Sequence, residues 1–211
     1  MTDVVGIVGS ARKQGNTELL MQRLLSHLER GGFDVEMIGL ADKRIEMCRA
    51  CDCCRGLSRC VVQDDFEEIY AKLFKAKGII IASPVYSYGP APKLMSCCIR
   101  ASRWAHSFSG STCSKEENED DLHASALAGK IGAAFAVARR AGGSSALSLM
   151  NVFFLRNQMY LVGSARMNIV FGDGKGAVLE DREGVANLDL LAENIGWLMK
   201  RIAPSEKQKR D

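Results

Sequence analysis

Short apolar runs alternate with longer segments of helical periodicity along most of the chain, and this alternation constrains the fold more than any other feature. The apolar runs occupy residues 4–9, 33–40, 78–83 and 130–138, and QMYLVGS (158–164) leads into a fifth. The helical segments occupy residues 17–30 and 64–77, a stretch beginning near Pro92, and residues 144–159 and 185–202. Strands and helices in steady alternation predict an α/β fold, with a doubly wound five-stranded parallel sheet and helices on both faces.

The length of 211 residues is enough for one large domain with a single hydrophobic core. Hydrophobic residues make up 47% and charged residues 25% of the chain, as in ordinary globular proteins. We expect one domain over residues 1–203, with a cysteine-rich insertion at 48–60 and a flexible tail at 204–211. A second interruption, residues 105–127, contains the acidic run SKEENEDD and is typical of a solvated loop.

Charge and hydropathy exclude two classes of partner. The formal net charge is +3 and no lysine- and arginine-rich stripe is visible, so we expect no binding to nucleic acid. No apolar run is long enough to span a bilayer, and the N-terminus has the pattern of a strand, not of a signal peptide. We therefore expect a cytoplasmic protein without membrane contact. Thiols stay reduced in that compartment, which favours ligands or catalytic groups over disulfides for the eight cysteines.

Three unusual loops follow the first, third and fourth predicted strands, at the edge of a parallel sheet where ligands bind. The first, GSARKQGNTELL (9–20), places Ser10, Arg12, Asn16 and Thr17 before and at the start of a helix. Free backbone N–H groups and the helix dipole favour a phosphate there, hydroxyl groups can donate to it, and the arginine adds charge. The loop has neither a P-loop nor a dinucleotide fingerprint. The alternative is a polar turn in which Asn16 or Thr17 caps the helix.

The other two loops suit a flat ring. SPVYSYGPAPKL (83–94) sets two tyrosines among three prolines, which predicts a stiff, partly apolar wall with backbone amides for a polar edge. In ARRAGGSS (138–145), Gly142 and Gly143 let the backbone approach a ligand closely. The alternatives are a proline-rich turn with tyrosines half buried in the core, and a plain strand-to-helix turn. Taken together, the three loops describe a mononucleotide that carries a large ring, and FMN is the natural candidate.

The motifs GSxRxxGNT and SPVY, followed by a glycine pair after the fourth strand, resemble the NADPH-dependent FMN reductase family of flavodoxin-like proteins. The similarity extends over nearly the whole chain, including LAGKIGAAFAVARRAGG (127–143) and the helix after it. It implies a flavodoxin-like fold and FMN as cofactor. By resemblance, the residues that hold the FMN phosphate are Ser10, Arg12, Asn16 and Thr17, and those that border the isoalloxazine are Pro84, Val85, Tyr86, Ser87, Gly142 and Gly143.

One stretch departs from the family pattern. After the tyrosine loop, relatives often have an acidic residue directly before an arginine, whereas this chain reads LMSCCIR (94–100). Arg100 is kept and the acid is lost. We therefore expect the contacts that this stretch makes, in helix packing or between subunits, to differ from those of relatives.

Five cysteines fall within CRACDCCRGLSRC, a stretch of thirteen residues. Cys48, Cys51, Cys54 and Cys60 have the spacing C-x2-C-x2-C-x5-C, a small perimeter on which four thiolates can wrap one [4Fe-4S] cluster. This spacing resembles the compact motif of the iron–sulfur flavoproteins, a branch of the same family. Cys53 lies outside the pattern. The alternatives are zinc, which more often takes two C-x2-C pairs, a loop inherited from cluster-binding relatives and now empty, and artificial disulfides in oxidised apo-protein.

The remaining cysteines and the histidines show no ligand spacing. Cys97 and Cys98 fall on an apolar helix, where cysteine is usually a small core residue. Residues without a functional assignment are Cys113, His27, His106 and His123. Flavin chemistry needs no side-chain general acid or base here, so we nominate no catalytic residue.

We therefore expect an FMN-containing iron–sulfur flavoprotein that passes electrons between a reduced donor, ferredoxin or NAD(P)H, and an acceptor. NAD(P)H would bind only transiently, because no nicotinamide fingerprint is present. The resemblance implies a homo-oligomer, a dimer or tetramer, in which the cluster loop of one subunit approaches the flavin of another. Two alternatives stay open: a cluster-free NAD(P)H-dependent FMN or quinone reductase, and a non-catalytic binding module that holds FMN.

Overall fold

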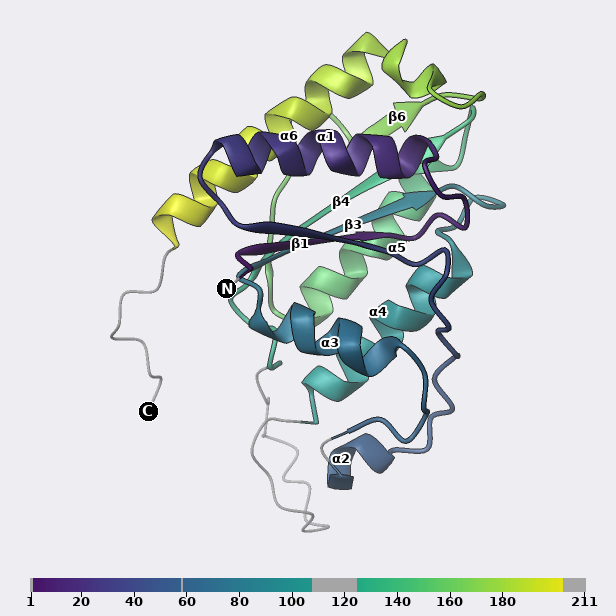
Figure 1. The fold of residues 1–211 in the computed structure, drawn as a ribbon, viewed down its shortest axis with the longest axis vertical. Helices are drawn as coiled ribbons and strands as arrows, with labels where there is room; N and C mark the ends of the chain where they lie inside the picture. Colours follow the sequence, from purple (N-terminus) through teal and green to yellow (C-terminus); the bar gives the residue numbers. More distant parts are fainter. Residues whose placement is uncertain (1, 58, 108–124, 203–211) are drawn as a thin grey trace.

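The structure is a computed structural model that describes residues 2–57, 59–107 and 125–202 (Figure 1). Three sequence predictions fall outside these residues: the tail at 204–211, most of the acidic loop at 105–127, and the assignments of Cys113 and His123. No helix in the described part of the chain is long and apolar enough to cross a membrane.

The strands of the described residues form one parallel sheet. They are β1 (Val4–Val8), β2 (Val35–Gly39), β3 (Gly78–Pro84), β4 (Ile131–Ala138), β5 (Tyr160–Leu161) and β6 (Ile169–Phe171). The order is β2-β1-β3-β4-β5, and β6 also pairs with β4. The sheet therefore has the five predicted positions, and β5 and β6 share the fifth. The central strands β1, β3 and β4 are buried almost throughout, which is why their sequences are unbroken apolar runs.

The fifth position is divided between two short strands. β5 pairs with the first two residues of β4, and β6 pairs with the last three. Between them, the side-chain amide of Asn168 donates to the carbonyl oxygen of Ala134 at 3.0 Å. The buried asparagine thus satisfies a carbonyl group that a continuous strand would otherwise pair.

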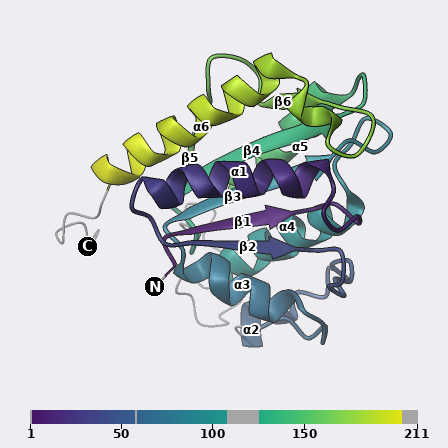
Figure 2. The ribbon, with the colours of Figure 1, turned by 45° about the horizontal axis from the view of Figure 1, so that its top comes forward.

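Helices cover both faces of the sheet, as predicted. They are α1 (Asn16–Arg30), α2 (Cys53–Leu57), α3 (Phe66–Lys75), α4 (Pro92–Ala105), α5 (Gly143–Arg156) and α6 (Arg182–Arg201), with a 3₁₀ turn, η1 (Ala177–Leu179), before the last. α1 and α6 lie on one face, and α3, α4 and α5 lie on the other (Figure 1, Figure 2). The short helix α2 stands away from the sheet, beyond α3 and α4. The fold is therefore the doubly wound α/β arrangement.

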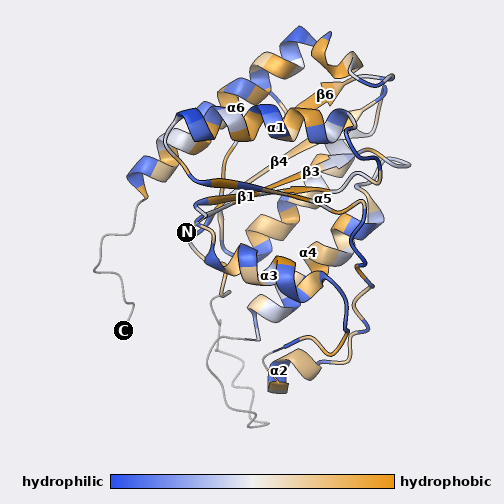
Figure 3. Ribbon diagram, viewed as in Figure 1, coloured by the Kyte–Doolittle hydropathy of each residue, from blue (hydrophilic) through white to orange (hydrophobic). Residues whose placement is uncertain are grey.

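The helix boundaries follow local signals in the sequence. α1 ends at Arg30 with Gly31 as its C-cap, and the next residue, Gly32, has a φ of +90° that suits glycine. α6 begins at Arg182, three residues earlier than predicted, because Asp181 caps it by accepting a hydrogen bond from the backbone N of Gly184 at 2.9 Å. In Figure 3, α1 alternates between hydrophilic and hydrophobic residues as an amphipathic helix does, whereas α5 is hydrophobic over most of its length.

We expect Gly132→Ala, in β4, to lower the free energy of unfolding by about 1–3 kcal/mol, the cost of overpacking a core. A Cβ atom at Gly132 would lie 2.3 Å from Cδ1 of Phe154, a fully buried ring on α5. Gly39→Ala in β2 is the matched control, because a Cβ atom there meets nothing within 4 Å. It should change the free energy of unfolding by less than about 0.5 kcal/mol. Equal stabilities of the two variants in urea titrations would contradict this packing.

Candidate functional site

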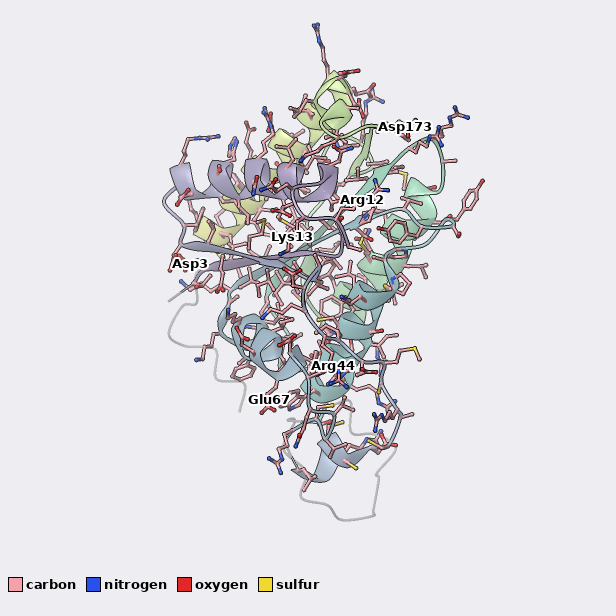
Figure 4. The ribbon with its side chains drawn as sticks, turned by 45° about the vertical axis from the view of Figure 1, so that its right-hand side comes forward. Asp3, Arg12, Lys13, Arg44, Glu67 and Asp173 are labelled. Carbon is pink, nitrogen blue, oxygen red and sulfur yellow. The ribbon has the colours of Figure 1, made fainter. Side chains whose placement is uncertain are left out.

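The loops after β1, β3 and β4 meet because these strands are neighbours in a parallel sheet and end at the same edge. We name the group formed by residues 9–15, 85–91 and 139–142 the carboxyl edge. Figure 4 shows Arg12 at this end of the sheet together with Asp173, whereas Asp3 lies toward the opposite end. All three loops that the sequence singles out thus lie at one edge of the sheet.

The loop after β1 leads into a helix that no side chain caps. The Ser10 hydroxyl folds back on its own loop, accepting from the backbone N of Arg12 at 3.0 Å and donating to the Arg12 carbonyl at 3.1 Å. Gly15 occupies the N-cap position of α1, and among the described residues no side chain caps this helix end. The alternative in which Asn16 or Thr17 is the cap is therefore wrong. The free N–H groups and the positive end of the helix dipole lie at the carboxyl edge, where they attract an anion.

A fourth loop, residues 172–176 after β6, is absent from the predicted set and closes over the start of α1. The side-chain Nδ2 of Asn16 donates to Gly174 O at 2.8 Å, and its Oδ1 accepts from Gly176 N at 2.7 Å. Both polar atoms of this amide are thus engaged by the protein, so the contact of Asn16 with a phosphate stays a prediction. The available signal was the glycine-rich run GDGKG (172–176), because several glycines in one loop often mark a close approach of the backbone.

The loop after β3 is a tight hairpin that presents its tyrosines to solvent. Tyr86 and Gly89 exchange two backbone hydrogen bonds of 2.8 and 2.9 Å. Between them Ser87 and Tyr88 have φ of +46° and +68°, which is the geometry of a type I′ turn. Tyr86 is 43% and Tyr88 is 66% exposed, so neither ring belongs to the core, contrary to the alternative.

Gly142 brings the loops after β3 and β4 into contact. Its φ is +82°, and a Cβ atom there would lie 2.8 Å from Tyr88 Cα and 3.0 Å from Val85 Cγ1. A Cβ atom at Gly143 would lie 2.7 Å from Cγ2 of Ile169 in β6. The glycine pair therefore allows the loops to pack on one another. Its close approach to a ligand stays a prediction.

Basic side chains border the carboxyl edge. Arg12, Arg139 and Arg140 are exposed. Arg139 Nε lies 2.9 Å from Asp173 Oδ2, an exposed ion pair that ties the loop after β4 to the 172–176 loop. The edge thus combines positive charge, an uncapped helix N-terminus and exposed aromatic rings. This set of groups fits a cofactor with a phosphate and a large flat ring, as FMN has.

The four cysteines of the predicted motif line one cavity, which we name the cysteine cavity. Its wall includes Cys48, Cys51, Cys54, Cys60 and, from α4, Arg100, Arg103 and Trp104. Cys53 is not part of the wall, and its thiol donates to the Cys51 carbonyl at 3.5 Å. The thiols are free. Within the described residues no three Cys, His, Asp or Glu side chains are gathered as a metal ion requires, so the thiols would have to draw together to bind a cluster.

A buried ion pair closes the neck of the cysteine segment. Asp64 Oδ2 accepts from Arg100 Nη1 at 2.5 Å and from the backbone N of Glu46 at 2.8 Å, and Oδ1 accepts from the backbone N of Phe66 at 3.2 Å. The side chains of Arg100 and Asp64 are 2% and 0% exposed. Residues before and after the cysteines are thus joined through one carboxylate, so the segment is anchored at its base.

Arg100 also reaches the cysteines. Its Nη2 donates to Cys60 Sγ at 3.2 Å and to Val62 O at 3.4 Å, and Nη1 donates to Glu46 O at 3.2 Å. The guanidinium carbon lies 4.1 Å from the centre of the Phe66 ring. Its Nε is buried and has no hydrogen-bond partner within the described residues. A sulfur-rich anion held by the four thiolates would bring acceptors to this wall, so the donor set fits an iron–sulfur cluster.

Arg100 pairs with an acid from another part of the chain, Asp64. Burial acts to raise the pKa of Asp64, but the hydrogen bond from Arg100 and those from two backbone N–H groups outweigh it, so this pKa lies below its usual value. Cys97 and Cys98 are buried, as predicted for core residues, and burial raises the pKa of Cys97 to about 12. Burial thus disfavours the thiolate form of both side chains.

The order of strands and the position of the loops define the class of protein. The structure matches a flavodoxin from the domain Archaea with a TM-score of 0.58 and 14% sequence identity, over 94% of this chain and 99% of the other. At that identity the likeness concerns the fold alone. It confirms the predicted flavodoxin-like fold.

Relatives by sequence narrow the class to a family. The sequence model of the NADPH-dependent FMN reductase family matches residues 2–173. An iron–sulfur flavoprotein from Methanocaldococcus jannaschii is 33% identical over 162 residues, covering 76% of this chain and 75% of that protein. A second iron–sulfur flavoprotein from the same organism is 33% identical over 195 residues, covering 86% and 89%. The chain belongs to the NADPH-dependent FMN reductase family, and it is a flavin-dependent oxidoreductase with FMN as its cofactor.

We expect Gly142→Ala to weaken FMN binding, because the added Cβ would displace the tyrosine hairpin. The strain of the φ of +82°, roughly 1–2 kcal/mol, destabilises the protein with or without FMN, so the displaced hairpin is what should raise the Kd for FMN, by about tenfold. Titration of apoprotein into FMN, followed by flavin fluorescence, measures this Kd. Gly129→Ala is the control: its φ of +75° imposes the same strain, but a Cβ there meets nothing within 4 Å, at the other end of β4. Wild-type affinity in Gly142→Ala would mean that this glycine does not organise the site.

Asp64→Asn should lower the free energy of unfolding by about 3–5 kcal/mol at neutral pH, because it leaves the buried charge of Arg100 uncompensated. The pKa of Asp64 is lower in the folded state, so the stabilisation by its carboxylate is complete above the unfolded pKa, about 3.9. It is lost as pH falls through the folded pKa. The deficit of the variant should therefore shrink in acid, as urea titrations at several pH values would measure.

The control for Asp64→Asn is Asp189→Asn, which removes the partner of Arg23 from a more exposed ion pair. This change should cost less than about 1 kcal/mol. Equal losses in the two variants would show that the Asp64 pair is no more important than a surface pair.

Proposed function

We propose that this chain is an FMN-containing iron–sulfur flavoprotein that transfers electrons between a reduced donor and an acceptor. A [4Fe-4S] cluster would be held by Cys48, Cys51, Cys54 and Cys60. The observation that carries the proposal is the cysteine cavity, whose wall includes these four thiols and leaves Cys53 out. The names of the two Methanocaldococcus relatives, both iron–sulfur flavoproteins, support the same assignment.

The carboxyl edge would hold the flavin. The backbone N–H groups at the start of α1 would bind the phosphate, with Ser10, Arg12 and Thr17 beside them. Asn16 would act by fixing the 172–176 loop next to that site. Residues 84–87 would border the ring system, and the exposed tyrosines would shield it from water. Together the two bound groups would supply conversion between two-electron and one-electron transfer.

The two sites lie at different ends of α4. Pro92, at the start of the helix, directly follows the tyrosine hairpin, whereas Arg100 and Arg103 near its end line the cysteine cavity. From Pro92 to Arg103 the helix advances roughly 16 Å at 1.5 Å per residue. This separation within one chain supports a homo-oligomer, a dimer or tetramer, in which the cysteine segment of one copy lies near the carboxyl edge of another. The exposed apolar residues Leu149 and Val152 on α5 are further support.

A donor such as ferredoxin or NAD(P)H would supply the electrons. In and next to the cysteine segment, Met47, Leu57 and Val61 are exposed apolar side chains, and Arg49 and Arg59 are exposed basic ones. A surface with apolar and basic side chains suits a small acidic donor protein. At the carboxyl edge, NAD(P)H would act by transient contact with the ring system.

A cluster-free NAD(P)H-dependent FMN or quinone reductase is the second candidate. One observation favours it: over residues 2–57, 59–107 and 125–202 the ligating side chains are not gathered into a metal-binding group. This enzyme would need the carboxyl edge but not the cysteine quartet. The two candidates therefore differ in whether iron binds and whether activity depends on it.

Cys54→Ser separates the two candidates. Wild-type protein reconstituted without oxygen should contain about four iron and four sulfide per chain together with FMN. Cys54→Ser should lose most of the iron and keep its FMN, whereas Cys53→Ser, which alters a thiol outside the cavity wall, should match wild type. Iron, sulfide and FMN are assayed on one sample with its visible spectrum. Retention of both iron and activity in Cys54→Ser would defeat the cluster assignment, and wild-type protein with FMN alone would support the cluster-free reductase.

A further inference from the structure

Arg100 connects the buried core to the cysteine cavity through a planar guanidinium. Nη1 serves the Asp64 carboxylate and the Glu46 carbonyl, while Nη2 serves Cys60 Sγ and the Val62 carbonyl. Four acceptors in different directions fix the plane of the group. Cys60 is therefore held at a set position by a charge-assisted donor.

Burial strengthens the hydrogen bond between Arg100 and Cys60. Two residues of the cavity wall are almost fully buried: Arg100 is 3% exposed and Trp104 is 5% exposed. They keep water from this side of Cys60. A hydrogen bond in such low-dielectric surroundings is stronger than one in water. Asp64 balances the charge of Arg100, so what remains at Cys60 is chiefly the directed N–H···S bond.

A donor aimed at a ligating sulfur has a defined effect on an iron–sulfur cluster. Reduction adds one electron, and that negative charge is shared with the sulfur atoms. Hydrogen bonds to those sulfurs stabilise the reduced state more than the oxidised one, which moves the reduction potential to more positive values. The buried Nε of Arg100, which has no partner in the described chain, is a second donor on the same wall.

We propose that Arg100 is a positioning residue of the cysteine site: it fixes Cys60 as a ligand and, through the N–H···S hydrogen bond, makes the bound cluster easier to reduce. The inference rests on the proposed function, since it concerns a cluster held by the four cysteines. Asp64 acts behind it, because its carboxylate orients the guanidinium. The core of the protein thus adjusts a redox centre that lies on a segment outside that core.

Arg100→Lys tests the role of the hydrogen bond. Lysine keeps a positive charge near Asp64 but lacks the planar fork that serves Cys60 and Val62 together. We expect the midpoint potential of the cluster, from a redox titration followed by electron paramagnetic resonance, to become more negative. Loss of iron to a chelator should become roughly tenfold faster. Arg103→Lys is the matched control, because Arg103 lines the same cavity but pairs with Asp52.

A second variant separates the loss of the hydrogen bond from a folding defect. Arg100→Gln combined with Asp64→Asn replaces the ion pair by two neutral amides, so no unpaired charge is left buried. Circular dichroism and FMN binding should show that this protein folds. Its cluster should show the same negative shift of the midpoint potential, because the charge-assisted donor to Cys60 is gone.

The outcomes distinguish a specific role of Arg100 from a general effect of the cavity wall and from failure of the proposed function. A wild-type midpoint potential in both Arg100 variants, with FMN binding intact, overturns the role of Arg100 and leaves the proposed function standing. A shift of the same size in Arg103→Lys also overturns it, since any change in the cavity wall would then suffice. Wild-type protein that binds FMN but takes up neither iron nor sulfide overturns the proposed function, and this inference with it.

Discussion

Parallel hydrogen bonding among β1, β3 and β4 is the constraint on which the rest of the structure depends. These strands are buried on both faces, so their backbone groups have to be satisfied within the fold, and most of them pair with a neighbouring strand. Parallel pairing requires long crossover connections that return to the same end of the sheet, and among β1, β3 and β4 these connections contain helices. The N-terminus of α1, the tyrosine hairpin and the Gly142 turn are therefore neighbours, although long helical segments separate them in the sequence. The site that we propose for FMN is a consequence of this pairing.

The position of the cysteine segment is not set by strand pairing. The segment lies between β2 and α3, and its regular structure in the described residues is the five-residue helix α2. Its base is held by Asp64, which joins the backbone on both sides of the cysteines, and by Arg100 of α4. A buried ion pair adds little stability compared with apolar side chains in the same place, but each buried charge can be satisfied by few other groups of the protein. This pair therefore specifies where the segment leaves the core, and α4 is the element that connects the two candidate sites.

Much of the fold and of the site could be read from local patterns. The strands, the helices and the three loops depend on apolar runs, periodicity and turn residues, all of which act within a few positions of the chain. The spacing of Cys48, Cys51, Cys54 and Cys60 likewise identifies the four thiols that share a cavity wall, and it excludes Cys53. The 172–176 loop could not be read in this way, because its partner Asn16 lies more than a hundred residues away.

The sequence by itself determined the alternation of strands and helices, the family and the cysteine quartet, because each is encoded by neighbouring residues. Only the tertiary structure decided how the fifth strand divides around Asn168, and which acid pairs with Arg100. Hydrogen bonds of this kind join positions with no periodic relation, and their geometry exists only after the sheet and its helices have packed. The contact between Arg100 and Cys60 belongs to the same class, since a helix on one face of the sheet supplies it to a segment that lies beyond the sheet.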